Sequence, residues 1–285
     1  MYTILRKDNV APNVDRYVIA APDVAAKAQP GQFVVLRLHE QGERIPISIS
    51  DWNRDAGTIT LIVQVVGHTT QQMAAMEIGD SILDLLGPLG KPAVIEPMGT
   101  IACVAGGVAT AIIYPEARQH RKVGNRVLTL VGVRNQDHLF YQEELAAISD
   151  RVLVATDDGS YGHKGFVTDL LQQVIDDGIH LDQVIAIGPI PMMQAVAELT
   201  KRYEIKTVVS LNPIMMDGTG MCGACRVRVG DEIKFCCTDG PEFDGHLVDF
   251  TSLLRRSRLY ERLEYEASLP VKEREGKGCD GRCHE

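Results

Sequence analysis

Four of the seven cysteines, Cys222, Cys225, Cys236 and Cys237, lie in one glycine-rich stretch between residues 216 and 241. A run this rich in glycine cannot form a regular helix or strand, but it can wrap around a compact object and point backbone amides at it. Thiolates are the soft ligands of iron–sulfur clusters, and amide hydrogen bonds to the sulfurs set the reduction potential. We therefore predict an iron–sulfur cluster here, and expect the rest of the chain to exchange electrons with it.

The spacing of the candidate ligands narrows the kind of metal site. Asp217, Cys222, Cys225 and Cys237 form the pattern D-x4-C-x2-C-x11-C. This is the spacing of plant-type [2Fe–2S] loops, with an aspartate in the first position. A carboxylate is a harder ligand than a thiolate but is competent for iron. Zinc sites favour paired C-x2-C units or histidines at matching spacing, and this segment has one C-x2-C, so the pattern favours iron–sulfur.

The fourth ligand is open on spacing alone. Cys236 and Cys237 are adjacent, so in a strand they would point to opposite faces and only one would reach the cluster. In one ligand set, Asp217 joins Cys237 and the C-x2-C pair. In the other, Asp217 is a solvent-facing loop residue and Cys236 is the fourth ligand.

Length, charge and the chain start exclude several functions. With 285 residues the chain is long enough for two domains and a small third one. A net charge of −9 argues against nucleic acid or an anionic membrane as partner. We find no apolar run of the roughly 18 residues that span a membrane, and the first residues lack the apolar region of a signal peptide. We therefore expect a cytoplasmic protein.

Residues 1–98 are predicted to form an antiparallel β-barrel, because short alternating segments are separated by turn residues. The predicted turns include Gly87-Pro88-Leu89-Gly90. A short helix is expected over residues 69–76, with Thr69 or Thr70 as its N-cap. The predicted strands are Asp15–Ala20, Gln32–Leu38, Pro46–Asp51 and Thr58–Val65.

Two places in the barrel are candidates for cofactor contacts. Pro46 removes a backbone donor from its strand, so a flat ring could lie on that edge with Ser48 offering its hydroxyl. The alternative is an edge strand with a solvated Arg44. The start of the short helix, with Gly67, Thr69 and Thr70, has free N–H groups and hydroxyls suited to a pyrophosphate, although a simple helix cap explains it equally well.

In residues 99–212 strands alternate with helices, which predicts a doubly wound parallel sheet. The predicted elements include strands over residues 126–133 and 183–187 and helices over residues 138–148 and 167–176. Nucleotides bind such sheets beyond the carboxyl ends of the strands. The candidate contacts there are Gly106, Gly107, Thr110, Arg134, Asp157, Gly188 and Pro189. Acidic residues near these loops disfavour a 2′-phosphate, so we expect NADH rather than NADPH. Cys103, inside an apolar strand, is expected to be a buried small hydrophobe.

The cluster segment, residues 213–245, is followed by a predicted C-terminal region, residues 246–285. A long helix is expected over about residues 248–267, because leucines recur near helical spacing. The polar end of the chain carries Cys279, Cys283 and His284, which could bind metal or a partner, although a frayed tail is the simpler reading.

These motifs resemble a known family. They are ERIPISISD, VQVVGHTT, AGGVATA, ATDDGSYGHKG, IGPIPMM, MMDGTGMCGACRV and CTDGPEFDGHLVDF. A flavin barrel, a nicotinamide domain and a [2Fe–2S] loop occur in this order in the electron-transfer subunit of dihydroorotate dehydrogenase type B. The chain is more similar to the small subunit of NADH-dependent reduced ferredoxin:NADP oxidoreductase, where aspartate also replaces the first cysteine. The Cys-x-Asp-Gly-Pro ending selects Cys237 as the ligand.

The resemblance implies a ferredoxin-reductase-like fold with FAD on the barrel, NAD(H) on the parallel sheet and a C-terminal [2Fe–2S] segment. It also implies a larger flavin and iron–sulfur partner that handles NADP and ferredoxin, with the complex performing flavin-based electron bifurcation. No catalytic acid or base is expected, because the cofactors supply the chemistry. The residues expected to contact FAD are Arg44, Ile45, Pro46, Ile47, Ser48, Ile62, Val63, Gln64, Gly67, Thr69 and Thr70.

Two departures from the family pattern leave other functions open. Related flavin domains usually place arginine three residues before the serine, where this chain has Ile45, and Arg44 lies one position earlier. Ala109 stands where glycine is common, which would narrow the approach of the nicotinamide. The alternatives are an electron-transfer subunit of a dihydroorotate dehydrogenase and a non-catalytic redox-sensing or scaffold subunit.

Overall fold

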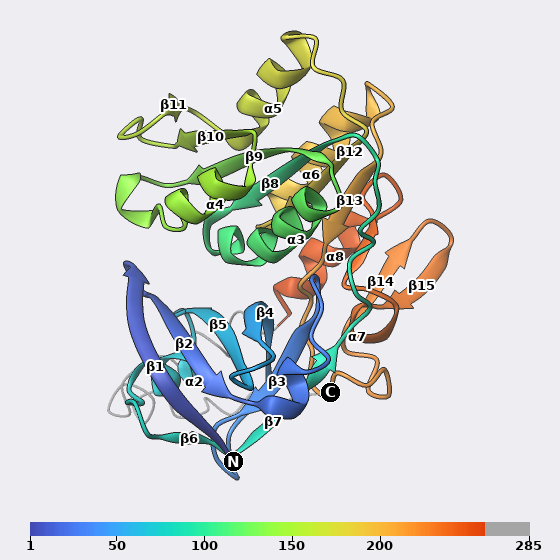
Figure 1. Cartoon of the computed structure of the whole chain (residues 1–285). Helices are drawn as coiled ribbons and strands as arrows, with labels where there is room; N and C mark the ends of the chain where they lie inside the picture. The colour runs from blue at the N-terminus through green and yellow to red at the C-terminus, as the bar shows by residue number, and fades with distance from the viewer. Residues whose placement is uncertain (260–285) are drawn as a thin grey trace, which may run out of the picture.

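The computed structural model describes residues 1–259. The first part of the chain forms a seven-stranded sheet of order β6-β1-β2-β5-β4-β3-β7, in which every pair is antiparallel. The two edge strands, β6 and β7, are separated by Leu83 alone, so the sheet curls into a nearly closed barrel (Figure 1). The strands are β1 (Tyr2–Ala11), β2 (Val14–Ala20), β3 (Phe33–Arg37), β4 (Ile45–Asn53), β5 (Thr58–Gln64), β6 (Ser81–Ile82) and β7 (Asp84–Leu89). The predicted barrel is confirmed.

The barrel interior is built from alternate residues of these strands, as period-two patterning requires. Tyr17, Leu36, Ile49 and Leu61 are at most 1% exposed and pack together there. The Tyr17 hydroxyl donates to the Met73 carbonyl at 3.0 Å, which satisfies the one polar group at the end of this buried ring. The same contact fastens helix α2 (His68–Ala74) across the barrel end; α1 (Pro22–Ala25) follows β2.

Two local predictions in the barrel were wrong, and strands β1 and β6 were not predicted. The expected turn at Gly87-Pro88 lies inside β7, because the residues on either side of it, Leu86 and Leu89, pair with β3. The two strands approach closely there, and a Cβ at Gly87 would lie 2.7 Å from Val34 Cγ1. Helix α2 begins after Gly67 rather than at Thr69 or Thr70; the Thr70 hydroxyl accepts from the Gly67 N–H at 2.9 Å.

The second part of the chain is the predicted parallel sheet. Its strands run in the order β10-β9-β8-β12-β13, and the order reverses between β8 and β12. Strand β11 adds in parallel at one edge and β16 antiparallel at the other. The strands are β8 (Thr100–Gly106), β9 (Arg126–Val133), β10 (Arg151–Thr156), β11 (His163–Lys164), β12 (Gln183–Ile187), β13 (Thr207–Ser210) and β16 (Glu242–Asp244).

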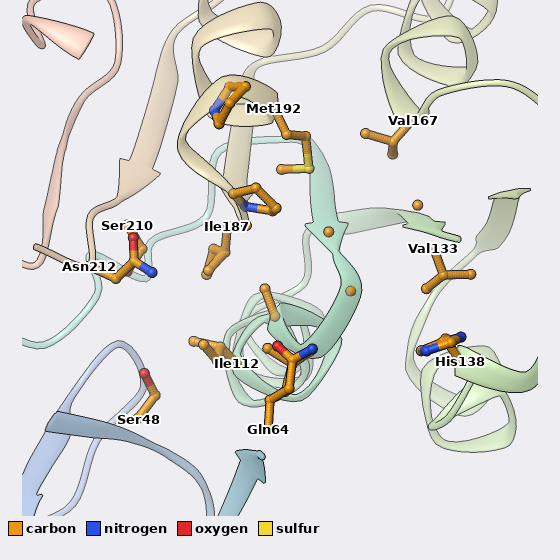
Figure 2. A pocket seen from close by; sticks show the side chains of 18 of the residues that line it. Ser48, Gln64, Ile112, Val133, His138, Val167, Ile187, Met192, Ser210 and Asn212 are labelled. Atoms are coloured by element: carbon orange, nitrogen blue, oxygen red, sulfur yellow. The ribbon is translucent and has the colours of Figure 1, made fainter. Parts of the chain in front are cut away.

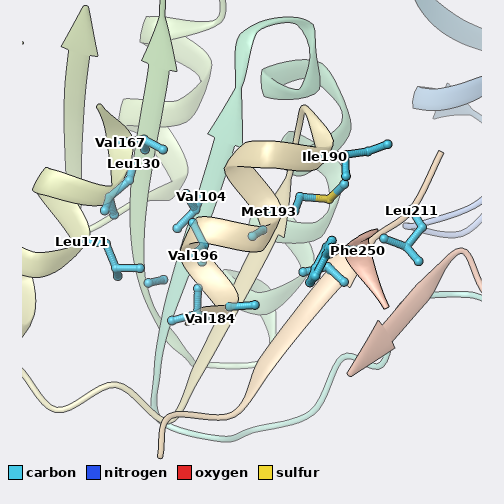
Figure 3. Close-up of a cluster of buried hydrophobic side chains, with 14 of the residues drawn as sticks. Val104, Leu130, Val167, Leu171, Val184, Ile190, Met193, Val196, Leu211 and Phe250 are labelled. Carbon is cyan, nitrogen blue, oxygen red and sulfur yellow. The ribbon is translucent and has the colours of Figure 1, made fainter. Parts of the chain in front are cut away.

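Helices cover both faces of this sheet, which explains why its strands read as continuous apolar runs. Cys103 and its alternate neighbours pack under α3, whereas Val104 and its alternate neighbours pack under α5 and α6 (Figure 3). The predicted burial of Cys103 is confirmed. The helices are η1 (Gly107–Ala109), α3 (Thr110–Lys122), η2 (Gln136–His138), α4 (Gln142–Ile148), α5 (Val167–Asp176) and α6 (Ile190–Lys201).

Helix α4 begins later than the sequence predicted. The expected helix over residues 138–148 is interrupted by Tyr141, whose φ of +61° is left-handed and cannot continue a helix. Tyr141 is held there by edge-to-face contacts with Tyr114 and Phe140, whose ring centroids lie 5.4 Å and 5.3 Å away. The aromatic packing therefore outweighs the local cost of the backbone conformation.

The cluster segment departs from the prediction in one detail. After the hairpin β14 (Arg226–Val229) and β15 (Glu232–Phe235), Cys236 and Cys237 open a short helix, α7 (Cys236–Asp239), rather than lying in a strand. The two cysteines therefore do not point to opposite faces of a strand, contrary to the prediction. In Figure 1 the hairpin stands beside the sheet domain, and the loop before it runs down toward the barrel.

The C-terminal helix is shorter than predicted within the described residues. Helix α8 (Phe250–Ser257) begins at the Asp249 cap, whose carboxylate accepts from the Ser252 N–H at 2.9 Å. It ends at Ser257, and Leu259 is 61% exposed, so no apolar contact extends the helix there. Residues 260–267 of the predicted helix, together with Cys279, Cys283 and His284, lie outside the described residues. Within residues 1–259, no helix has the length and apolar character needed to cross a bilayer.

Barrel and sheet domain meet through α3 and β4. Arg118 donates to Asp51 at 2.7 Å, and its guanidinium lies over the rings of Trp52 and Tyr114 at 5.7 Å and 5.2 Å. An ion pair together with two cation–π contacts holds the two domains in one orientation. The predicted boundary between residues 98 and 99 falls in the extended connection between β7 and β8.

Candidate functional site

A cavity of about 740 Å³ lies between the barrel and the carboxyl ends of the sheet strands. Its walls come from three parts of the chain: strands β4 and β5 of the barrel, the loops after the sheet strands, and the residues on either side of the cluster loop. Figure 2 shows Ser48 and Gln64 on the barrel side facing Ile112, Val133 and Met192 of the sheet domain. The cavity lies where the sheet order reverses, the place predicted for a nucleotide.

The barrel wall exists because β4 leaves β5 partway along. Residues 45–48 pair with β3 only, whereas β4 pairs with β5 from Ile49 onward. Pro46, which has no N–H to donate, lies in this stretch without a β5 partner and lines the cavity together with Ser48. Pro46 pairs opposite Val35 of β3, so along this stretch β4 is open only on the side that β5 has left.

Some of the predicted FAD residues point into the cavity, and others point away from it. Pro46, Ser48 and Gln64 line the cavity, whereas Ile45 and Ile47 point to the barrel core. The other members of the set lie outside the cavity wall. Val63 is buried in the barrel core, Ile62 packs against Phe140, and Arg44 is exposed.

The predicted pyrophosphate site lies at the start of α2, away from the cavity wall. The Thr70 hydroxyl accepts from the N–H groups of Val66 and Gly67 at 3.0 Å and 2.9 Å. Thr69 is 4% exposed and donates to the Glu43 carboxylate at 3.0 Å. Both threonine hydroxyls therefore act within the protein as a helix cap and a tether for the β3–β4 loop.

The glycines at the ends of β8 and β12 let the two strand ends approach each other. A Cβ at Gly106 would lie 2.6 Å from Met192 Sδ and 2.8 Å from Pro189 Cδ. A Cβ at Gly188 would lie 2.8 Å from Met192 Cε. Gly107 has a φ of +59° and faces open space, so its backbone is accessible from the cavity. This arrangement suits a dinucleotide that lies close to the chain.

Thr110 and Ala109 support this loop from behind. Thr110 is 1% exposed, and its hydroxyl donates to the Gly107 carbonyl at 2.8 Å. Ala109 is 3% exposed and packs with Ile113 in the core under α3. The extra methyl group at position 109 is therefore accommodated mainly by the core.

Arg134 and Asp157 lie at the rim of the cavity, and both are exposed. They follow β9 and β10, so each stands at the carboxyl end of a neighbouring strand. Several cavity residues were not predicted: Phe33, His138, Phe140, Phe166, Met192, Ser210 and Asn212. Phe166 and Asn212 could have been found, because they lie directly before α5 and shortly after β13. Phe33 lies in a barrel strand and carries no local pattern that indicates the cavity.

The cluster loop brings two of the predicted ligands together. Cys225 Sγ and Cys237 Sγ lie 3.2 Å apart, and the Cys237 N–H points at Cys225 Sγ at 3.5 Å. Cys222 is exposed, and its sulfur accepts from the Ala224 N–H at 3.5 Å. Cys236 is buried in the main core. Within residues 1–259, no three His, Cys, Asp or Glu side chains converge into a complete metal site.

Asp217 organises the loop in the structure. Its two carboxylate oxygens accept from the N–H groups of Thr219 and Cys222 at 2.8 Å and 2.9 Å. The Thr219 hydrogen bond is the main reason why the pKa of Asp217 is lowered. Burial, followed by the hydrogen bond to Cys225, raises the pKa of Cys237 to about 12. Ligation by a metal would therefore release a proton from this thiol.

The donor set of the loop fits an iron–sulfur cluster. Thiols and a carboxylate lie on one short loop, and backbone N–H groups point at two of the sulfurs. Gly218, Gly220 and Gly223 have φ values between +69° and +85°, which bend the loop and turn its amides inward. These are the ligand types and hydrogen bonds that such clusters use.

The cluster loop also lies against the barrel. A Cβ at Gly218 would lie 2.6 Å from Leu89 Cδ1 and 2.9 Å from Val35 Cγ2. The Lys91 N–H donates to the Gly240 carbonyl at 2.6 Å. Met215 and Pro241, on either side of the loop, line the large cavity. The loop is therefore packed between the cavity and the outer face of β3 and β7.

A buried carboxyl pair lies where the three parts of the chain meet. Glu116 of α3 is fully buried, and Glu242 of β16 lies against Gly31 of the barrel. Burial, followed by the proximity of Glu242, raises the pKa of Glu116 well above its usual value of 4.5, and burial also raises the pKa of Glu242. Burial therefore favours the neutral, protonated form of both carboxyl groups.

Two family models match the chain. The model described as the iron–sulfur cluster binding domain of dihydroorotate dehydrogenase B matches residues 212–249. The oxidoreductase NAD-binding domain matches residues 103–198. The two matched segments cover the predicted cluster loop and most of the parallel sheet.

The chain is 45% identical to a dihydroorotate dehydrogenase B (NAD(+)) electron transfer subunit homolog from Thermotoga maritima, over 93% of this chain and 95% of the relative. The chain belongs to the family of dihydroorotate dehydrogenase B electron-transfer subunits and their homologues. The electron transfer subunit from Shouchella clausii is 34% identical over 85% of this chain and 94% of its own length.

A solved structure of the NADH-dependent reduced ferredoxin-NADP oxidoreductase, analysed for flavin-based electron bifurcation, has the same fold. It is 44% identical, with a TM-score of 0.88, over 93% of this chain and 97% of that chain. Together these similarities confirm the ferredoxin-reductase-like fold and the predicted cofactors FAD, NAD(H) and a [2Fe–2S] cluster. The chain is an electron-transfer oxidoreductase subunit, and its relatives work with a larger partner subunit.

Proposed function

We propose that this subunit exchanges electrons with NAD(H) in a complex that couples NADH, NADPH and ferredoxin by flavin-based electron bifurcation. The observation that carries the proposal is that three parts of the chain line one cavity. They contribute Ser48 from the barrel, Gly106 from the sheet domain, and Met215 and Pro241 from either side of the cluster loop. When bound, the flavin exchanges a hydride with the nicotinamide and single electrons with the cluster. The cavity gives the flavin and the nicotinamide one continuous space, beside the cluster loop that Met215 and Pro241 flank.

The residues of each wall have distinct roles in this proposal. Pro46, Ser48 and Gln64 bind the flavin, since β4 leaves an open edge there. The dinucleotide lies over the strand ends, where the backbone is accessible; these contacts are Gly106, Gly107, Arg134, Asp157, Gly188 and Pro189. The cluster ligands are Asp217, Cys222, Cys225 and Cys237.

The partner in this proposal is a larger flavin and iron–sulfur subunit that handles ferredoxin and NADP. Support comes from the similarity to the reduced ferredoxin-NADP oxidoreductase structure, which extends over 93% of the chain. The aspartate at position 217 is the sequence feature that favours this branch.

The test begins with iron, acid-labile sulfide and flavin content, and an EPR spectrum of the reduced protein. We expect two irons and two sulfides per FAD, as one [2Fe–2S] cluster requires. Mixing with NADH in a stopped-flow instrument should bleach the flavin faster than NADPH does, because the acidic pair Asp157-Asp158 disfavours a 2′-phosphate. A flavin that neither nucleotide bleaches would refute nicotinamide turnover and favour a redox-sensing or scaffold role.

A second candidate function is the electron-transfer subunit of an NAD-dependent dihydroorotate dehydrogenase. It is favoured by the relatives from Thermotoga maritima and Shouchella clausii, which carry that description. Purification of the native complex distinguishes the two functions. A co-purifying subunit that reduces the flavin with dihydroorotate would exclude the bifurcating complex, whereas ferredoxin-dependent NADP reduction would exclude dihydroorotate dehydrogenase.

A further inference from the structure

The cluster loop is held by a helix from outside its own segment. Phe250 and Leu253 of α8 are buried in the same core as Cys225. At the start of the helix, the Asp249 N–H donates to the Arg228 carbonyl at 3.0 Å. Helix α8 is therefore fixed against β14, the strand that directly follows Cys225.

From the last turn of this helix, Arg256 reaches the loop. Its Nη2 donates to the Ala224 carbonyl at 2.9 Å. A trans peptide is planar, with its C=O and N–H pointing in opposite directions. The bond from Arg256 therefore turns the next N–H, that of Cys225, away from the guanidinium. Within residues 1–259, this N–H forms no backbone hydrogen bond.

The preceding peptide has the same arrangement. Arg226 Nη1 donates to the Gly223 carbonyl at 3.0 Å, and on the opposite side the Ala224 N–H points at Cys222 Sγ at 3.5 Å. Two consecutive peptides between the predicted ligands are thus each held by a guanidinium on the outside. In the first of them, the inward N–H already donates to a ligand sulfur.

We propose that Arg256 is a positioning residue that aims the Cys225 N–H at the cluster and thereby raises the cluster's reduction potential. The inference rests on the proposed cluster at Asp217, Cys222, Cys225 and Cys237. Amide hydrogen bonds to cluster and thiolate sulfurs stabilise the reduced, more negative form. The permanent positive charge of the guanidinium acts in the same direction.

The test compares reduction potentials in the full-length protein with its flavin and cluster bound, by EPR-monitored redox titration. Arg256→Met keeps most of the side-chain volume and removes both the donor and the charge. It should make cluster reduction about tenfold less favourable, which lowers the potential by about 59 mV for one electron. Arg256→Lys should show a smaller decrease, because a flexible ammonium keeps the charge but not the planar fork.

Arg255→Met is the matched control. Arg255 lies in the same last turn of α8 and is exposed, so its loss should leave the potential unchanged. A second readout is proton ENDOR of the reduced cluster in H₂O and D₂O. The exchangeable proton of the Cys225 amide should couple to the cluster in the wild type, and its coupling should weaken in Arg256→Met.

The outcomes separate this inference from the proposed function. A wild-type protein without iron and sulfide would refute the cluster and the inference with it. A cluster whose potential and proton coupling are unchanged in Arg256→Met would overturn the inference alone. So would an equal shift in Arg255→Met. If Arg256→Met loses the cluster while Arg256→Lys keeps the wild-type potential, Arg256 only holds the loop folded and the tuning role is refuted.

Discussion

The buried carboxyl pair makes the stability of this protein depend on pH in a specific way. Glu116 has a folded-state pKa well above 4.5, chiefly because of burial. Its stabilising contribution is complete below the unfolded-state pKa and is lost as the pH rises toward the folded-state value. In that window Glu116 keeps a proton in the folded protein that it has lost in the unfolded chain, and this difference by itself lowers the free energy of unfolding by about 1.4 kcal/mol per pH unit.

Replacing Glu116 by glutamine removes this proton without removing the contact. A glutamine amide donates a hydrogen bond to Glu242 at any pH and has nearly the same shape. We therefore expect Glu116→Gln to gain stability relative to the wild type as the pH rises above 4.5, by about 1.4 kcal/mol per pH unit. The gain should level off once the wild-type pair has lost its proton.

Urea unfolding at a series of pH values measures this difference. The single tryptophan, Trp52, lies at the interface of barrel and sheet domain and reports their separation, and far-UV circular dichroism reports the secondary structure. The control is Glu198→Gln on the exposed side of α6, where the carboxylate accepts from Gln194 at 2.8 Å. For Glu198→Gln, the free energy of unfolding should change with pH as it does in the wild type. If the Glu116→Gln profile is also parallel over the whole range, the pair does not hold an extra proton.

Three further predictions concern the cofactors. Cys237→Ser should lose most of the iron measured by colorimetric assay, whereas Cys236→Ser should retain it, because it is the Cys237 sulfur that lies 3.2 Å from the Cys225 sulfur; equal iron in both variants would contradict this ligand assignment. Asp217→Cys should keep a [2Fe–2S] spectrum with a lower reduction potential, because thiolate donates more charge than carboxylate; an unchanged spectrum and potential would mean that Asp217 is not a ligand. Gly106→Ala should raise the Kd for NADH about tenfold, about 1.4 kcal/mol, because the new methyl group meets Met192 and Pro189 and pushes the ends of β8 and β12 apart. A wild-type Kd, measured by titrating flavin bleaching with NADH, would show that the dinucleotide does not need these strand ends to lie close together.

Several elements could be predicted from the sequence with correct bounds. Strands β9 and β12 and helix α5 have the limits that their apolar runs and bounding turn residues indicated. Strands buried on both faces leave long apolar runs, and an amphipathic helix leaves a clear 3.6-residue repeat. The same locality explains why the spacing of Asp217, Cys222, Cys225 and Cys237, all within 21 residues, predicted the cluster.

Side-chain direction in the barrel could be predicted only in part. The alternation that sends Ile45 and Ile47 inward also sends Pro46 and Ser48 outward, but alternation does not say which face meets a cofactor. That depends on where β4 separates from β5, and this separation is a property of the closed barrel. For the same reason the proline inside β7 was misread as part of a turn.

By itself, the sequence determined the order of the modules, the parallel sheet and a cysteine loop that holds a [2Fe–2S] cluster, because these depend on neighbouring residues and short spacings. Only the tertiary structure decided which distant residues meet. Arg256 reaches Ala224 across 32 positions, and Glu116 meets Glu242 beside the barrel. Such contacts depend on how separately encoded elements pack, and many partners are compatible with any one charged side chain. The position of the cluster loop between cavity and barrel is decided by the same packing.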